Sequence, residues 1–185
     1  MVRAVMLMLG PLLVALANDF GTSIAVSGQL AAATFVTFGI TAPLVGPISD
    51  TYGRRPVLLI GVLLMALGVL GSGAAWSYGS LMATRLITGV GLAMLPPTIM
   101  AALADNLPPE KLGKAVGFMH SASWVGVALG VPAIALLGYI GGWRLPFYIT
   151  GGLSLALWVM LYLSLPSGQR RLGQSIDLIN RFKVI

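Results

Sequence analysis

The chain has 185 residues, of which 57% are hydrophobic and 9% are charged. A soluble domain carries roughly 25% charged residues, so this composition excludes an ordinary water-soluble fold and indicates a protein of the lipid bilayer. The net charge of +6 does not predict nucleic-acid binding, because the bases lie in short segments between apolar runs. A chain with no cysteine and one histidine has neither disulfides nor cysteine-ligated zinc. We therefore expect no cofactor, no metal site and no enzymatic activity.

Six apolar runs long enough, or nearly long enough, to cross a bilayer follow one another along the chain. A helix needs about 20 apolar residues to span the roughly 30 Å hydrocarbon layer. The predicted spans lie near 4–17, 29–48, 56–75, 81–103, 115–138 and 145–165. Charged residues, Gly or Pro interrupt the chain between them. The sequence therefore predicts an all-α integral membrane domain over 1–166 and a basic cytoplasmic tail over 167–185.

The first predicted span, 4–17, is the shortest. As a helix it rises only about 21 Å, which is less than the layer requires. Arg3, the apolar run and Ala15-Leu16-Ala17 also imitate a signal peptide with its small-residue cleavage site. We favour a first helix that lacks its inner turns, either natively or because the true start lies upstream, with a signal peptide as the alternative.

A charged turn follows the second span: Gly46-Pro47-Ile48-Ser49-Asp50-Thr51-Tyr52-Gly53-Arg54-Arg55-Pro56. An acid and two arginines cannot lie in hydrocarbon, so this segment predicts a hairpin at one membrane face. Gly53 permits the turn, and Asp50 can pair with a base or cap the following helix. Arg54 and Arg55 can bind acids, helix C-terminal carbonyls or lipid phosphates.

The positions of the basic residues predict the orientation. If the 46–55 hairpin is cytoplasmic, nine bases including Arg3 lie inside, Arg144 alone lies outside, and Arg85 is left within a span. Cytoplasmic segments carry the excess of Lys and Arg. We expect a multi-pass protein of the plasma (inner) membrane with both termini in the cytoplasm.

Two further segments contain candidate functional residues. Arg85 is a full charge inside the fourth span, where it indicates a water-lined path or an anionic partner; the alternative is a side chain that reaches the outer interface. Gly126, Gly130 and Pro132 predict a bent fifth helix with a smooth packing face.

The chain also contains a faint internal repeat. An offset of 89 positions aligns Pro43 with Pro132, Gly53 with Gly142 and Arg55 with Arg144. Each triplet joins the second and third spans of a three-span unit, as expected of inverted three-helix repeats. Ordinary turn chemistry is the alternative explanation, because Gly and Arg recur at hairpins.

Three motifs resemble those of the major facilitator superfamily. The 46–55 turn resembles its loop signature Gly-x-x-x-Asp-(Arg/Lys)-x-Gly-(Arg/Lys)-(Arg/Lys), with Thr51 in place of the first base. Arg85 to Gly91 resembles the fourth-helix motif Arg-x-x-(Gln)-Gly-x-Gly. Gly126 to Pro132 is similar to the fifth-helix motif of antiporters and exporters, although Val131 splits its Gly-Pro pair. The Gly-Val-Pro and Gly-Trp-Arg-x-x-Phe segments are closer to drug and sugar exporters of the arabinose-efflux-permease type.

The resemblance implies the amino-terminal six-helix half of a twelve-helix transporter, and it implies roles for particular residues. A cytoplasmic latch would comprise Gly46, Asp50, Gly53, Arg54 and Arg55, with Asp105 as the acidic partner. Arg85 and Gly89 would serve proton or substrate coupling.

The function implied by the resemblance is export of a small-molecule solute by alternating access, with the lipid bilayer as the surroundings. Six helices cannot enclose the family's solute path, so we expect either a homodimer or a missing carboxy-terminal half. No Asp or Glu lies inside a predicted span to titrate against a solute. The alternative function is a non-transporting membrane subunit that binds another protein.

Overall fold

The structure, a computed structural model, describes residues 2–164, and the predicted tail over 167–185 lies outside this range. Six segments within it are long and apolar enough to cross a membrane. Their helices are α1 (Val2–Leu7), η1 (Gly10–Leu12), α2 (Leu13–Asp19), α3 (Ile24–Tyr52), α4 (Arg54–Gly73), α5 (Tyr78–Asn106), α6 (Pro109–Gly141) and α7 (Arg144–Ser164). The prediction of an all-α membrane protein with six spans is confirmed.

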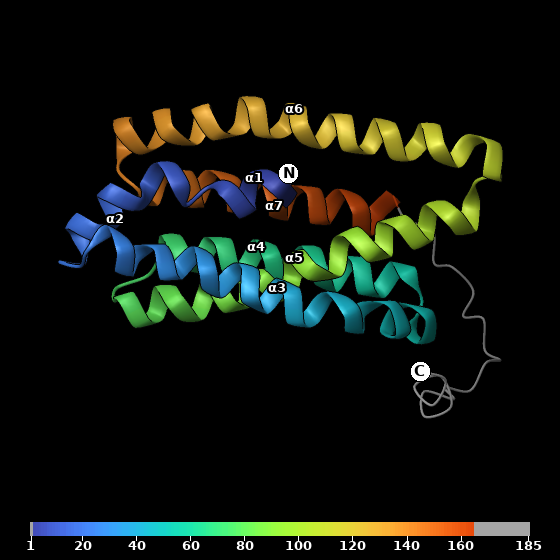
Figure 1. The fold of residues 1–185 in the computed structure, drawn as a ribbon, viewed down its shortest axis with the longest axis horizontal. Coiled ribbons are helices and arrows are strands. Elements are labelled where there is room, and N and C mark those ends of the chain that lie inside the picture. The colour runs from blue at the N-terminus through green and yellow to red at the C-terminus, as the bar shows by residue number, and fades with distance from the viewer. Residues whose placement is uncertain (1, 165–185) are drawn as a thin grey trace.

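The first spanning segment consists of α1, η1 and α2, and its helix is interrupted at Gly10 and Pro11. Pro11 has no backbone N–H to donate and its ring disfavours a continuous α-helix. The segment has 18 residues, Val2–Asp19, and so rises at most about 27 Å, against about 44 Å for the 29 residues of α3. The described part of this segment, which begins with α1 at Val2, consequently starts about half-way along the bundle (Figure 1).

This position corrects one expectation from the sequence. Arg3 does not lie with the bases of the 46–55 hairpin, because its side chain contacts His120 and Trp124 in the middle part of α6. The residues that Arg3 contacts lie on α6, well away from the Arg54–Asp105 contact at the hairpin end of the bundle.

The helix ends follow local chemistry, and α3, α5 and α6 extend at both ends beyond the spans predicted from hydropathy. Ser23 caps α3 by accepting from the Val26 N–H at 3.1 Å, and Ser77 and Ser80 form a capping box at the start of α5. Gly53 ends α3 with φ 92° and ψ 154°. Gly142 ends α6 in a similar conformation, with φ 75° and ψ 169°. Residues with a Cβ almost never adopt this conformation.

The six spans divide in chain order into two inverted three-helix repeats, and several helix pairs follow that symmetry, although the extensive α4–α5 contact has no comparable counterpart between α7 and the first segment. The first repeat is Val2–Asp19, α3 and α4, and the second is α5, α6 and α7. The close pairs include α3 with α5, α1 with α6, and α4 with α7. In the inverted repeat α5 corresponds to the first segment, α6 to α3, and α7 to α4. The α3–α5 pair therefore corresponds to the α1–α6 pair, and the α4–α7 pair corresponds to itself. Figure 1 shows α6 along one edge of the bundle, with α3, α4 and α5 gathered on the other side.

Glycine allows α5 to approach its neighbours closely. A Cβ at Gly89 would lie 2.7 Å from the Thr34 carbonyl oxygen of α3, and one at Gly68 of α4 would lie 2.8 Å from the Thr88 nitrogen. Real Cβ atoms do not approach backbone so closely. Helices in a membrane associate through such contacts between small residues. The central α3–α4–α5 layer therefore depends on positions that have no side chain.

Candidate functional site

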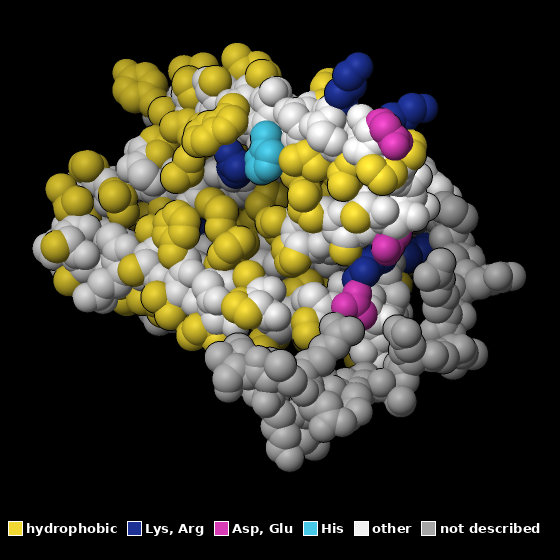
Figure 2. All heavy atoms as spheres, turned by 45° about the vertical axis from the view of Figure 1, so that its right-hand side comes forward, with side chains coloured by type: hydrophobic (Ala, Val, Ile, Leu, Met, Phe, Trp, Pro, Cys, Tyr) yellow, Lys and Arg dark blue, Asp and Glu magenta, His cyan; other side chains and the backbone are white. Residues whose placement is uncertain are grey.

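A cluster of charges joins three helix ends at the 46–55 hairpin. Arg54, the first residue of α4, donates from Nε to Asp105 Oδ2 of α5 at 3.0 Å. The same guanidinium pairs with Asp50 of α3 and donates to Ser49 Oγ at 2.6 Å. Figure 2 shows acidic and basic side chains side by side at this end. The cluster thus links the ends of α3 and α5 to the start of α4.

Arg55 has a different role from its neighbour. It donates from Nη2 to the Tyr162 carbonyl at 3.1 Å, and its guanidinium lies 5.9 Å from the Tyr162 ring centroid. The last carbonyls of a helix have no partner within that helix, so Arg55 binds one end of α7. The sequence left acids, helix C-terminal carbonyls and lipid phosphates as alternative partners for these two arginines. In the structure Arg54 binds acids, and Arg55 binds a helix carbonyl.

The two glycines of the hairpin differ in their surroundings. Gly53 has the positive φ of the turn, which is the function expected of it. Gly46 has no neighbouring atom within 4 Å of where a Cβ would lie. It therefore does not mediate a close helix–helix approach within residues 2–164.

A second charged cluster lies at the opposite end of the bundle. Asp19 at the end of α2 accepts from Trp143 Nε1 at 3.0 Å and from Arg144 Nη1 at 3.3 Å. Arg144 also donates from Nη2 to the Ala75 carbonyl at 3.2 Å and stacks on the Trp143 ring. This cluster was not predicted as a site, although the 89-residue offset that aligns Arg144 with Arg55 was a signal for it.

Arg85 is buried completely, with none of its surface exposed. It donates from Nε to Ser72 Oγ at 3.0 Å and from Nη2 to the Gly68 carbonyl at 3.4 Å. Its guanidinium lies 5.0 Å from the Phe147 ring centroid. The side chain therefore lies between α4, α5 and α7 and does not extend to the interface. No acid in the described part of the chain forms a salt bridge with it.

The fifth-helix motif lies on α6 and faces the first segment. A Cβ at Gly130 would lie 3.2 Å from the Ala4 Cβ of α1. Pro132 lies inside α6, which continues to Gly141. Gly126 is on the same helix. The motif thus allows α1 to pack against α6, on a different side of the bundle from Arg85.

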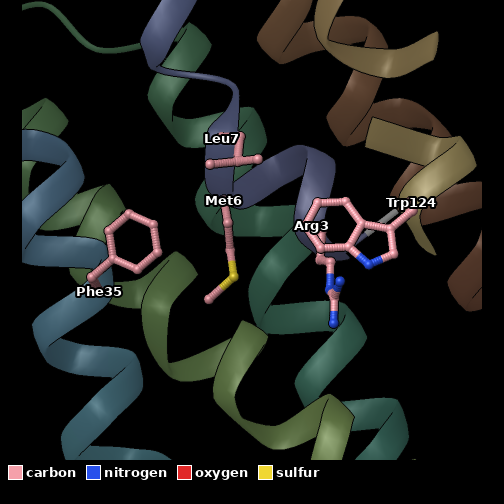
Figure 3. A pocket seen from close by; sticks show the side chains of 5 residues that line it. All are labelled: Arg3, Met6, Leu7, Phe35 and Trp124. Carbon is pink, nitrogen blue, oxygen red and sulfur yellow. The ribbon is translucent and has the colours of Figure 1, made fainter. Parts of the chain in front are cut away.

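A cavity of about 250 Å³ opens beside α1. It is lined by Arg3, Met6 and Leu7 of α1, Phe35 of α3 and Trp124 of α6. In Figure 3, Met6 lies between Phe35 and Trp124, and Arg3 lies against the Trp124 ring. The Arg3 guanidinium lies 4.6 Å from the Trp124 ring centroid, and its Nη2 donates to His120 Nδ1 at 3.1 Å. The sequence reasoning did not identify this site, because its residues are far apart along the chain.

The candidate residues therefore occupy separate places. The hairpin cluster and the Asp19 cluster lie at opposite ends of the bundle, Arg85 lies in the packed interior, and the Arg3 cavity lies among α1, α3 and α6.

Comparison with known proteins agrees with this architecture. Residues 1–182 match the sequence model of the Major Facilitator Superfamily. The 3-(3-hydroxy-phenyl)propionate transporter of Escherichia coli is 35% identical over 124 residues, which is 65% of this chain and 30% of the relative. The Escherichia coli inner membrane transport protein YdhP is 31% identical over 157 residues, 85% of this chain and 40% of the relative. The 4-hydroxybenzoate transporter PcaK of Pseudomonas aeruginosa is 32% identical over 158 residues, 85% of this chain and 35% of the relative.

The chain spans less than half the length of these curated relatives. The relatives carry the names of transporters and not of enzymes, which agrees with the expectation of a non-enzymatic membrane protein.

Proposed function

Because this chain belongs to the major facilitator superfamily, we propose that it forms one six-helix half of a transporter that moves a small molecule across the plasma membrane by alternating access. The observation that carries the proposal is the pair of charged clusters at opposite ends of the bundle. Arg54 links α4 to α5 at the hairpin end, and Arg144 links α7 to the first segment at the other end.

The strength of these ion pairs suits a reversible latch. Arg54 and Asp105 are part-exposed, with 27% and 55% of their side-chain surface accessible. Exposed pairs contribute about 0.2–1 kcal/mol each. A contact of that size biases a conformational equilibrium without trapping one state. In this proposal the hairpin cluster of Asp50, Arg54 and Asp105 holds the cytoplasmic side closed, and the Asp19–Arg144 cluster holds the opposite side closed.

A second half is needed to enclose the solute path. The least enclosed spans are α3 and α6, which expose large apolar side chains such as Phe35, Ile40, Trp124 and Leu129. In a twelve-helix member of this family the two halves are related by an axis along the membrane normal. We propose that these helices face either a second copy of the chain or a separate carboxy-terminal half.

Export is the proposed direction of transport, because the Gly126, Gly130 and Pro132 motif on α6 resembles that of exporters and antiporters. Two of the relatives are named for aromatic acids, 3-(3-hydroxy-phenyl)propionate and 4-hydroxybenzoate, which supports a small organic solute.

Arg85 and Gly89 are proposed to couple solute movement to helix packing. Among the described residues, the Arg85 guanidinium of α5 donates to two neutral acceptors, Ser72 Oγ and the Gly68 carbonyl, and both belong to α4. A shift of α4 against α5 would therefore lengthen or break these hydrogen bonds.

The experiment is flux in liposomes containing the purified chain, with its oligomeric state measured in the same preparation. A labelled aromatic acid, a labelled sugar and a drug-like cation are the test solutes. We expect flux of at least one solute, and we expect Asp105→Asn to change it several-fold. Glu110→Gln is the matched control, because it also removes one acid near the hairpin end but breaks no salt bridge of the described residues.

Three results would oppose the proposal. If the Asp105→Asn variant has unchanged flux, the hairpin cluster does not act as a latch. A chain that binds another membrane protein but moves no solute, as a dimer or with a second half, would favour the alternative of a non-transporting subunit. Solute flux only from the face opposite the 46–55 hairpin toward the hairpin face would indicate uptake and contradict the proposed export.

A further inference from the structure

Arg3 places a full positive charge in the middle of the bundle. Its neighbour Trp124 lies near the midpoint of α6 (Pro109–Gly141), and Phe35 lies well inside α3 (Ile24–Tyr52). A charged side chain at this depth in a membrane is costly unless it faces a water-filled cavity or an anion. The cavity beside Arg3 has room for such an anion.

The surroundings of Arg3 hold the guanidinium without neutralising it. Trp124 stacks against it, and His120 accepts a single hydrogen bond through Nδ1. No acid within residues 2–164 pairs with Arg3. Within residues 2–164, the Arg3 Nη1 and Nε groups donate to no acceptor, and Nη2 uses one of its two N–H groups on His120. Nη1 and Nε each share one edge of the planar guanidinium with Nη2, and such an edge presents two parallel donors to a carboxylate.

The rest of the cavity is apolar and aromatic. Phe35 and Trp124 come from different helices and lie on opposite sides of the space, and Met6 extends between them (Figure 3). Aromatic rings bind a flat ring by stacking or edge contacts, and methionine adapts to the shape of its neighbour. The volume of about 250 Å³ is below the roughly 300–1,000 Å³ typical of sites for drug-sized ligands. One ring with a short acidic chain is the size that suits it.

We propose that this cavity binds an organic carboxylate that carries one aromatic ring, with the carboxylate on Arg3 and the ring between Phe35 and Trp124. The proposal rests on the proposed transport function and names the class of solute. A second cavity, of about 280 Å³ and lined only by apolar side chains that include Val62 and Leu95, has no polar group to orient a solute. Figure 2 shows the histidine beside a basic side chain in a hollow of the hydrophobic surface.

The test is equilibrium binding to the full chain in lipid nanodiscs, measured by calorimetry with four probes. Benzoate carries both ring and charge, benzyl alcohol the ring alone, acetate the charge alone, and benzylamine the ring with the opposite charge. Because hydrogen bonds to charged groups are among the strongest in proteins, we expect benzoate to bind at least about tenfold more tightly than each of the others. This comparison uses the unmodified chain, so it does not depend on the folding of any variant.

Two variants assign the effect to the cavity. Arg3→Gln should weaken benzoate binding about tenfold or more while leaving benzyl alcohol unchanged, and Trp124→Leu should weaken both ring-bearing ligands. The matched control is Lys111→Gln, which removes one exposed positive charge near the start of α6 and should leave benzoate binding as it was. Circular dichroism of each variant verifies its helix content.

The proposal is overturned if benzoate binds no better than benzyl alcohol, or if a folded Arg3→Gln variant keeps the preference. Its failure is distinguishable from failure of the transport function. Selective benzoate binding without flux in any assembly would sustain this site and refute transport. Flux of a sugar or a cation by a chain that does not prefer benzoate would sustain the transport function and refute this site.

Discussion

Arg55 and Arg144 each bind the end of the helix to which the other belongs. Arg55, in the first turn of α4, donates to the Tyr162 carbonyl in the last turn of α7. Arg144, which begins α7, donates to the Ala75 carbonyl just beyond α4. Arg55 binds a carbonyl in the last turn of α7, Arg144 binds a carbonyl two residues past the end of α4, and each guanidinium lies near the negative end of the other helix's dipole. The contact is the same on both sides, with the two helices exchanged.

The two turns before these arginines should respond alike to substitution. Gly53→Ala and Gly142→Ala each introduce a Cβ at a φ and ψ that only glycine adopts readily, so each should lower the free energy of unfolding by about 1–3 kcal/mol. Thermal unfolding in nanodiscs measures this. Gly152→Ala, in α7 with no atom near its Cβ position, is the control and should be close to neutral. Strain at one turn only would show that the turns are not equivalent.

The two charged clusters should act on their own ends of the bundle. Asp105→Asn should increase hydrogen exchange where α3, α4 and α5 meet, and Asp19→Asn should increase it at the end of α2 and the α6–α7 turn. Loss of a part-exposed pair is worth up to about 1 kcal/mol, so exchange should rise up to about fivefold. Mass spectrometry of the exchanged peptides gives the measurement. The double variant should be additive, and a variant that mainly loosens the far end would contradict this assignment.

The contribution of Ser72 to the free energy of unfolding should depend mainly on its hydrogen bond with Arg85. Ser72→Ala removes the Oγ that accepts from Arg85 and should lower the free energy of unfolding by about 1.5–3 kcal/mol. In an Arg85→Met background the same change should be smaller by at least about 1 kcal/mol. Denaturant titration of the four proteins completes the cycle. Ser123→Ala is the control, because within the described residues its hydroxyl bonds to the Met119 carbonyl of its own helix. If Ser72→Ala has the same effect with and without Arg85, the two residues are not coupled.

Gly89 should tolerate no side chain, whereas a glycine on the neighbouring helix should. A Cβ at Gly89 would meet the Thr34 carbonyl oxygen and the Thr37 Cβ, so Gly89→Ala must move α5 away from α3. We expect a loss of about 1–3 kcal/mol. Gly28→Ala on α3 meets no atom within 4 Å and should be neutral or slightly stabilising. Thermal unfolding of the two variants decides, and a neutral Gly89→Ala would show that the helix pair adjusts freely.

The helices were predictable from hydropathy, but their full lengths were not. The predicted 115–138 span became α6, Pro109–Gly141, which includes Lys111 and Lys114. Hydropathy marks the portion that hydrocarbon accepts, whereas the hydrogen-bonded helix continues through the interface. For the same reason α5 continues past residue 103 to Asn106 and presents Asp105 to Arg54.

The partners of charged residues were predictable only where a motif named them. Asp105 was expected as the partner of the hairpin bases, and the structure places it on Arg54. The contact of Arg3 with Trp124 was not foreseen, because it depends on how far the first helix extends beside α6. A water-lined path or an anionic partner was predicted for Arg85, and the sequence did not identify its partners in the described part of the chain, which are a serine and a backbone carbonyl. Such contacts depend on tertiary packing, which periodicity does not encode.

The mirrored turns at Gly53 and Gly142 have a consequence for biogenesis. Two repeats that face opposite ways require related three-helix units to thread the translocon in opposite directions. The flanking bases supply the asymmetry, since one turn carries Arg54 and Arg55 and the other carries Arg144 alone. A single additional arginine at the second turn would therefore weaken the topogenic signal that keeps the two units in opposite orientations during insertion.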